Sequence, residues 1–313
     1  MIRATLHRPW SWSFAAAALT FAATTALTGG QGALGLLVAT LTFSAFSVVV
    51  GLGQMAVVTM GPGNVDLSIP AVMTLAGTLS LKLMDGEAGT EGWGLLLALA
   101  VGLGAGAASY ALILLLRIPP IIATLAASFV FQSIAIWSNR GLRVKPPDSL
   151  AALSTGATLG VPNLAWAALL LAAGFWVLLE RTAYGRRLSA IGQNSRAARL
   201  AGVPVEGVRA VTYLLSAVMA ALAGFALACF SGGAALNMGA EYLLMSVAVV
   251  VIGGSSIAGG ASNVPGIWGA SMFMFLLVSM LNSYGLGAGV RLLLTGAIII
   301  AVVAAASRGR REA

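Results

Sequence analysis

Side chains able to carry covalent or acid–base chemistry are scarce in this sequence. Its 313 residues include one histidine, one cysteine and nine acidic residues. The histidine, His7, lies in a basic stretch ahead of the first apolar run, so it cannot join a catalytic triad or a histidine-based metal site. Acids near the predicted membrane helices are few, mainly Asp66 and Glu241, so paired carboxylates for acid–base catalysis are missing too. We therefore expect no enzyme activity, no metal and no cofactor on this chain.

Nucleotide binding is not expected either. A P-loop requires Gly-Lys-Ser/Thr after a strand, but the two lysines, Lys82 and Lys145, each follow an apolar residue. Gly102, Gly104 and Gly106 alternate as in a dinucleotide-binding turn, yet they lie inside an apolar run with no strand before it. We interpret them as small residues that let two helices pack closely.

Polar residues near the ends of the apolar runs are the remaining candidates to contact a ligand. Two roles are open for Asp66: an ionisable residue near membrane depth usually has a function, whereas a carboxylate just before a helix with Pro70 in its first turn can cap that helix. The other candidates are of types that contact sugars, and packing or anchoring at the membrane interface is the alternative for each. The candidate translocation-path residues are Asp66, Ser68, Gln132, Trp137, Asn237, Glu241, Tyr242 and Asn282.

These residues must be positioned by membrane-spanning helices. Apolar residues make up 59% of the chain and charged residues 8%, against about 25% charged residues in a typical soluble domain. Many apolar runs approach the length of about 20 residues that a helix needs to cross a bilayer, and a backbone in lipid must satisfy its own hydrogen bonds. Continuously apolar stretches such as 292–306 exclude alternating barrel strands. The predicted fold class is an all-α polytopic integral membrane protein.

About ten transmembrane helices are predicted, some of them broken or re-entrant, with the N- and C-termini cytoplasmic. The first apolar run, which follows Arg3 and Arg8, could be a secretory signal peptide, but the apolar segments after it favour its retention as the first helix. The tails are residues 1–12 and 308–313, and a single transmembrane domain spans 13–307. The predicted helices are 13–28, 34–60, 67–84, 93–116, 120–137, 163–180, 207–230, 242–252, 264–281 and 290–307.

The basic residues indicate the topology. A net charge of +8 would suggest nucleic acid or acidic partners for a soluble protein, but here the basic residues lie mainly in short segments between helices, and such segments face the cytoplasm. Arg117 and the cluster 181–209 fit this orientation, whereas Arg140, Arg143 and Lys145 fall on the outer side and do not. We expect contact with membrane lipid and no nucleic acid as a partner.

Two glycine-rich interruptions break the helix pattern. The apolar segment 242–252 is too short to cross a membrane and runs into the glycine-rich segment 253–260. We call this glycine-rich segment and the residues up to the next helix the second break, because the first break, 61–66, lies earlier in the chain and precedes the third helix. Broken helices occur in membrane proteins where the backbone lines a cavity. The similar breaks in the two halves of the chain suggest a weak internal repeat.

The basic segment 181–206 has the pattern of a short capped helix between two membrane helices. Asn194 can cap the start of a helix, Gly202 suits the left-handed position at its end, and Pro204 blocks its continuation. Two turns cannot cross a membrane, so this helix should lie in the cytoplasm. It could dock a soluble partner, although composition alone favours an ordinary basic loop.

The same segment resembles a family motif. Thr182 begins the pattern Thr-x-x-Gly-Arg, Ala190 begins Ala-x-Gly-x-Asn, and Ala197 begins Ala-Ala-x-x-x-Gly-Val. These patterns are similar to the cytoplasmic loop of the ribose, xylose and autoinducer-2 class of ABC permeases, which is related to the branched-chain amino acid permeases. Further similar segments are 65–68, 119–125, 250–256 and 259–260. The chain departs from the family pattern at Asn64 and at 261–265.

The resemblance implies a function and partners. In that family this loop couples the permease to an ATPase, so ATP hydrolysis would occur on a separate chain. The implied function is the transmembrane permease subunit of an ABC importer, which moves a monosaccharide or similar small polar solute by alternating access. The implied partners are a cytoplasmic ABC ATPase subunit, a periplasmic or extracellular solute-binding protein, and a second permease copy or homologue, all at the bacterial inner membrane. The implied coupling residues are Gly185, Arg186, Ala190, Gly192, Asn194 and Gly202, and we add Arg187 and Arg199 for their charge alone.

Two alternatives stay open. A secondary transporter driven by an ion gradient would also have broken helices, but it should contain buried ionisable residues, of which this sequence has few. Related permeases for branched-chain amino acids or nucleosides leave the identity of the solute open.

Overall fold

The computed structural model describes residues 10–139, 144–284, 287, 289–290, 293–298 and 300–301. His7, Arg140, Arg143 and the predicted tail 308–313 lie outside the described residues. The predicted helix 290–307 is described only at residues 290, 293–298 and 300–301, which are helical.

The described chain is almost entirely helical, as predicted. Nine of the predicted helices are present, and each begins and ends within two residues of its predicted bounds. They are α2 (Ser11–Leu27), α3 (Ala33–Thr59), α4 (Ile69–Met84), α5 (Glu91–Leu116), α6 (Pro120–Ser138), α8 (Asn163–Arg181), α11 (Val205–Phe230), α12 (Tyr242–Ile252) and α13 (Val264–Ser283). The helix boundaries therefore follow from the apolar runs and the glycines and prolines between them.

Six of these helices can each cross a membrane by their length and composition: α3, α5, α6, α8, α11 and α13. Helices α2, α4 and α12 are shorter apolar helices, and α12 matches the short segment predicted before the second break. The protein is thus an all-α polytopic membrane protein. The number of ten crossings stays a prediction.

Four small elements were not predicted. One is α7 (Asp148–Thr155), and two are the strands β1 (Ala157–Thr158) and β2 (Val161–Pro162), which pair as an antiparallel hairpin. The two residues of its turn, Leu159 and Gly160, both have positive φ, at 55° and 76°, as a type I′ turn requires. The fourth is α9 (Ala183–Gln193), which precedes α10 (Ser195–Leu200). The short helix predicted after Asn194 is present as α10, whereas α9 was missed.

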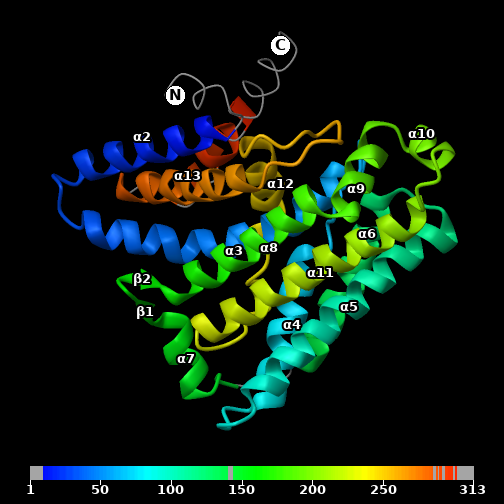
Figure 1. Ribbon diagram of the computed structural model, residues 1–313. Coiled ribbons are helices and arrows are strands. Elements are labelled where there is room, and N and C mark those ends of the chain that lie inside the picture. The colour runs from blue at the N-terminus through cyan, green and yellow to red at the C-terminus, as the bar shows by residue number, and fades with distance from the viewer. Residues whose placement is uncertain are drawn as a thin grey trace.

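Helix α11 lies at the centre of the molecule, between α3 and α5 (Figure 1). Glycines on the surrounding helices let them approach its backbone. A Cβ atom on Gly53 of α3 would lie 2.9 Å from the Cα of Ser216, and one on Gly106 of α5 would lie 2.8 Å from the Cα of Leu214. A Cβ on Gly102 would be equally close to α11, whereas Gly104 has open space beside it. The prediction that this glycine run serves close helix packing is confirmed.

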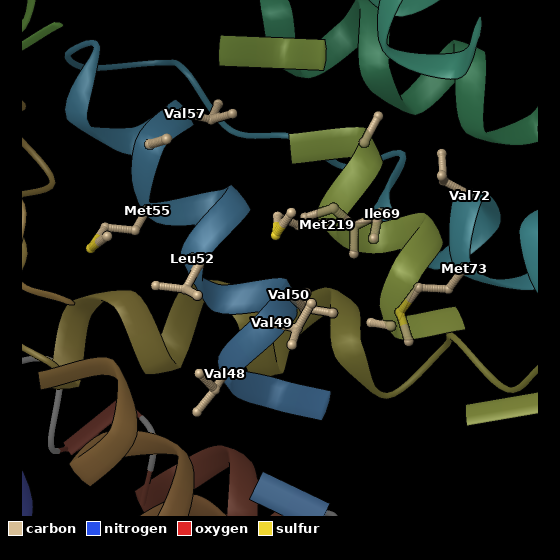
Figure 2. Close-up of a cluster of buried hydrophobic side chains, with 14 of the residues drawn as sticks. Val48, Val49, Val50, Leu52, Met55, Val57, Ile69, Val72, Met73 and Met219 are labelled. Carbon is tan, nitrogen blue, oxygen red and sulfur yellow. The ribbon is translucent and has the colours of Figure 1, made fainter. Parts of the chain in front are cut away.

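The buried core is made largely of aliphatic side chains and methionines from α3, α4 and α11. Figure 2 shows side chains of these three helices, with Val49, Val50 and Met219 where α3 meets α11 and with Leu52 and Met55 on the opposite side of α3. The labelled residues are Val48, Val49, Val50, Leu52, Met55, Val57, Ile69, Val72, Met73 and Met219. All of them are at most 8% exposed. This packing holds the first break, residues 61–66 between α3 and α4, against α11.

The molecule has two distinguishable ends. Helices α9 and α10 lie together at one end, and the β1–β2 hairpin and α7 lie at the opposite end (Figure 1). Helix α8 connects the hairpin to α9. We call the first end the basic end, because it carries the arginines of 181–209, and the second the hairpin end.

Candidate coupling site and translocation path

Helix α9 is amphipathic and is anchored by its first turn. The side chain of Thr182 accepts a hydrogen bond from the N–H of Gly185 at 3.5 Å, which caps the helix. Gly185 has no room for a side chain, because a Cβ there would overlap the backbone of Leu179 in α8. Leu188 and Ile191 are buried beneath the helix, while its arginines stay exposed. The helix therefore lies on the bundle with its basic side outward.

A second contact ties α9 to the central helix. The hydroxyl of Tyr184 lies 2.8 Å from Oγ1 of Thr212 in α11. Burial raises the pKa of Tyr184 to about 12, since the charged phenolate would be poorly solvated there. The phenol therefore stays protonated at neutral pH, and its hydrogen bond with Thr212 persists.

Asn194 forms the joint between α9 and α10. Its Oδ1 accepts hydrogen bonds from the N–H groups of Arg196 at 3.1 Å and Ala197 at 3.0 Å. At the other end, Gly202 has a φ of +83°, and the N–H of Val203 donates to the carbonyl of Ala198. Both the predicted cap and the predicted left-handed glycine are confirmed.

The last turn of α9 meets both helix breaks at a junction of glycines. A Cβ on Gly192 would overlap the carbonyl of Thr59, at the end of α3, and the N–H of Gly260, in the segment after α12. The N–H of Gly260 in turn donates to the Thr59 carbonyl at 2.9 Å, and Gly259 lies against Gly61. Because all these contacts are backbone to backbone, a displacement of α9 would press directly on both breaks.

A polar groove opens beside this junction. It has a volume of about 460 Å³ and is lined from α9 by Gly185, Arg186 and Ala190 and from the second break by Gly260 and Ser262. Three of the predicted coupling residues thus face one concave surface at the basic end. Such a groove can receive a protruding segment of another chain.

The exposed charge at this end is mainly positive, although Glu180 is exposed and lines the groove as well. Arg186, Arg187 and Arg196 are all exposed, and the side chain of Arg199 is 61% exposed although it contacts Glu206 at 2.6 Å. Leu200, at the end of α10, is 85% exposed. An acidic protein surface with an apolar patch would complement this arrangement.

Asp66 lies buried in the first break, just before the start of α4. It is 2% exposed. Its Oδ1 accepts from the N–H of Ser68 at 2.9 Å and from the Ser68 hydroxyl at 2.6 Å, and its Oδ2 accepts from Ser216 Oγ at 2.7 Å. The N–H of Asp66 donates to Oε1 of Gln54 at 3.2 Å. The N–H from which Asp66 accepts belongs to Ser68, the residue just before α4, and no side chain caps a first-turn N–H of this helix. The predicted capping role is therefore not confirmed, and Asp66 is instead the centre of a polar cluster between α3, α4 and α11.

Four other path candidates lie on α6 and on the segment that leads into α12. Gln132 of α6 donates from Nε2 to the carbonyl of Leu236 at 2.7 Å, in the segment 231–241 between α11 and α12. Asn237 and Glu241 are exposed in that segment, and Tyr242 is half-buried at the start of α12. The same segment packs at Gly239 against Pro70, in the first turn of α4, so it runs along the bundle toward the first break.

Trp137 lies on α6 and Asn282 on α13, and neither belongs to the two groups of candidates above. Trp137 is 70% exposed and lines a shallow apolar depression with Phe129 and Ile134, on a different face of α6 from Gln132. Asn282 is exposed near the end of α13. Interface anchoring or contact with lipid explains the position of Trp137.

Several residues of this architecture were missed by sequence reasoning. Gln54 and Ser216 contact Asp66 from α3 and α11, and Tyr110 contacts Glu206 from α5. Glu206 had a usable signal, as the acid within the basic cluster 181–209. The others had none, because their partners are 12 to 150 positions away in the sequence.

A polytopic helical bundle with two interrupted helices that meet at one end has the architecture of a membrane permease. Residues 36–303 match the family described as "Branched-chain amino acid transport system / permease component". The chain belongs to this family, and its predicted family resemblance is confirmed. It is a transport component and not an enzyme.

The relatives are import permeases. The autoinducer 2 import system permease protein LsrC of Klebsiella pneumoniae is 34% identical over 63% of this chain and 57% of its own length. The ribose import permease protein RbsC of Bacillus subtilis is 33% identical over 77% of this chain and 76% of its own length. The LsrC protein of Shigella flexneri is 29% identical over 84% and 77% of the respective lengths. No solved structure matches the chain.

Proposed function

We propose that this chain is the transmembrane subunit of an ATP-driven importer in a bacterial inner membrane, and that it forms the path for a monosaccharide or a similar small polar solute. The family description, a permease component of a transport system, supports the role. The names of the relatives, which are permeases for ribose and for autoinducer 2, support the class of solute. The family description also names branched-chain amino acids, and this is the alternative solute class.

The observation that carries the proposal is the glycine junction at the basic end. Gly192 places α9 in backbone contact with Thr59 and Gly260, so one exposed helix contacts both interrupted segments of the bundle. Beside it, the groove lined by Arg186 and Ala190 is open to a partner. A cytoplasmic ATPase that docks there would act on both breaks at once. The basic end and both termini would then face the cytoplasm.

The hairpin end would receive the solute. The segment 231–241 begins at this mouth, at a cavity of about 410 Å³ lined by Lys82, Asn139 and Lys145. A solute-binding protein would release its cargo here, and a second permease copy or homologue would complete the path. Access would alternate between the two ends as the breaks rearrange.

Co-purification with the ATPase tests the docking surface. We expect the Arg186→Glu, Asn194→Ala double variant to lose at least about tenfold in affinity for the ATPase, since it reverses a charge in the groove and removes the cap of α10. A tenfold loss corresponds to about 1.4 kcal/mol of binding free energy, which is within reach of a charge contact at an interface. The measurement is pull-down of the ATPase after co-expression. Lys145→Glu, a charge reversal at the hairpin end, is the matched control and should bind normally.

Two results would contradict the proposed function. If the double variant inserts as wild type does and still binds the ATPase, the docking surface lies elsewhere. If wild type binds no ATPase but proteoliposomes take up solute under an ion gradient alone, the chain is a secondary transporter.

A further inference from the structure

A chain of polar and aromatic contacts leads from α10 into the bundle, and it begins at Glu206. Both salt bridges found among the described residues involve this carboxylate. Oε1 of Glu206 lies 2.6 Å from Nη2 of Arg199, in α10, and 3.8 Å from Nη1 of Arg209, one turn further along α11. Glu206 itself lies in the first turn of α11. The ion pair with Arg199 therefore connects α10 directly to the start of the central helix.

The next contact brings in α5. The hydroxyl of Tyr110 lies 2.9 Å from Oε2 of Glu206 and 2.8 Å from its carbonyl oxygen. The ring of Tyr110 stacks on that of Tyr213 in α11, with centroids 5.9 Å apart and planes 27° apart. The close approach of Gly106 to the α11 backbone, one turn before Tyr110, permits this stacking. Glu206 is thus held from two sides, by a cation and by a buried phenol.

The contacts continue to the first helix break. The hydroxyl of Tyr213 donates to Oδ1 of Asn64 at 3.5 Å. Ser216, three residues later and therefore on the same face of α11, donates to Oδ2 of Asp66 at 2.7 Å. An unbroken series of contacts thus joins Arg199, on the exposed basic end, to the buried break 61–66.

We propose that Glu206 is a positioning residue that transmits movement of the ATPase-docking segment to the buried break through α11. This inference rests on the proposed function, because it assumes that an ATPase moves α9 and α10. Helix α9 contacts the breaks directly through Gly192, whereas α10 joins α9 at Asn194 and is paired to the start of α11 through Arg199. The Arg199–Glu206 pair makes α10 and the start of α11 move together, and the Ser216–Asp66 hydrogen bond passes that movement to the break.

The pair can be removed without loss of the fold. Arg199 is 61% exposed and Glu206 39%, and ion pairs as exposed as this contribute little to stability. Glu206→Gln keeps an oxygen that can accept from Tyr110 but removes the charge. Arg199→Gln removes the partner charge. Arg117→Gln is the control, because Arg117 is an exposed arginine at the end of α5, outside α9 and α10.

The test is solute uptake per ATP hydrolysed, measured in proteoliposomes that contain the permease, its ATPase and the solute-binding protein. We expect Glu206→Gln and Arg199→Gln to bind the ATPase and to hydrolyse ATP, but to take up at least about fivefold less solute per ATP, the lower range of allosteric coupling. The double variant should lose no more than either single variant, because both break the same link. Tyr110→Phe, which keeps the ring stack, should also lower the ratio. Arg117→Gln should match wild type.

Three outcomes would overturn this inference. The first is an unchanged uptake per ATP in Glu206→Gln. The second is a double variant whose losses multiply, since the two residues would then act independently. The third is loss of ATPase binding in the single variants, which would make Glu206 part of the docking contact. Failure of the wild-type permease to bind any ATPase would instead overturn the proposed function, so the two failures are distinguishable.

Discussion

Gly192 is the residue at which a single added methyl group would disturb three segments of the chain. Its Cα faces the end of α3 and the segment after α12, and both contacts are with backbone atoms that cannot rotate away. The sequence motif singled out this glycine through the family resemblance. The motif could not explain why position 192 needs a glycine, because Thr59 and Gly260 are remote in the sequence and only the folded chain brings them together.

We expect Gly192→Ala to lower the free energy of unfolding by about 1–3 kcal/mol, the usual cost of overpacking, and to reduce transport. The melting temperature in detergent and uptake by proteoliposomes are the measurements. Gly207→Ala is the control, since a Cβ there meets nothing within 4 Å and alanine favours a helix. A Gly192→Ala protein with the stability and uptake of wild type would show that the junction is looser than described.

Other residues at this end were predictable from local chemistry. The roles of Asn194 and Gly202 follow from capping rules that depend only on neighbouring residues. The contacts of Asp66 were predictable in part, because its bond to the N–H of Ser68 is local, while its bond to Ser216 spans 150 positions. Sequence reasoning therefore found the local half of each site and missed the contacts made across the bundle.

At the scale of the elements, the helix boundaries were predictable and the helix neighbours were not. Apolar runs and the breakers between them fixed the bounds to within two residues. Helix α9 was missed because Gly185 and Gly192 are poor helix formers, and its stability comes from Leu188 and Ile191, which are buried against the bundle. Tertiary packing thus overrides local propensity in this segment.

The seam between α5 and α11 gives a prediction at this scale. We expect Gly106→Ala to lower the melting temperature in detergent by several degrees, because its Cβ would lie 2.8 Å from the backbone of Leu214 and overpacking of this kind costs about 1–3 kcal/mol. Gly104→Ala, two residues away on the open face, is the control and should not lower it. Equal melting temperatures for the two variants would mean that the helices separate at no cost.

The whole molecule makes a prediction about sidedness. Cys229 is the single cysteine of the chain and is 3% exposed, so Cys229→Ala supplies a background for labelling. Leu159, at the tip of the hairpin, is 91% exposed, and Arg187 is exposed on α9. We expect a membrane-impermeant maleimide to label Leu159→Cys in intact spheroplasts and to label Arg187→Cys only after permeabilisation.

The reverse labelling pattern would invert the proposed orientation and place the docking surface outside the cell.

At this scale the sequence specified an all-α membrane protein and the order of its helices. It could not specify that the two breaks meet beneath one short helix, because such a meeting depends on how the two halves of the chain fold against each other.

Helix α11 is clamped at several points along its length by backbone contacts with its neighbours. Ser216 faces Gly53 of α3, Val218 faces Gly102 of α5, and Gly224 of α11 faces Met73 of α4. Contacts as close as these leave no room for the helix to bend, and densely packed interiors transmit strain. At 1.5 Å per residue, Glu206 and Phe230 are about 36 Å apart. A displacement at the basic end should therefore be felt at the hairpin end as a shift of the whole rod rather than a local bend.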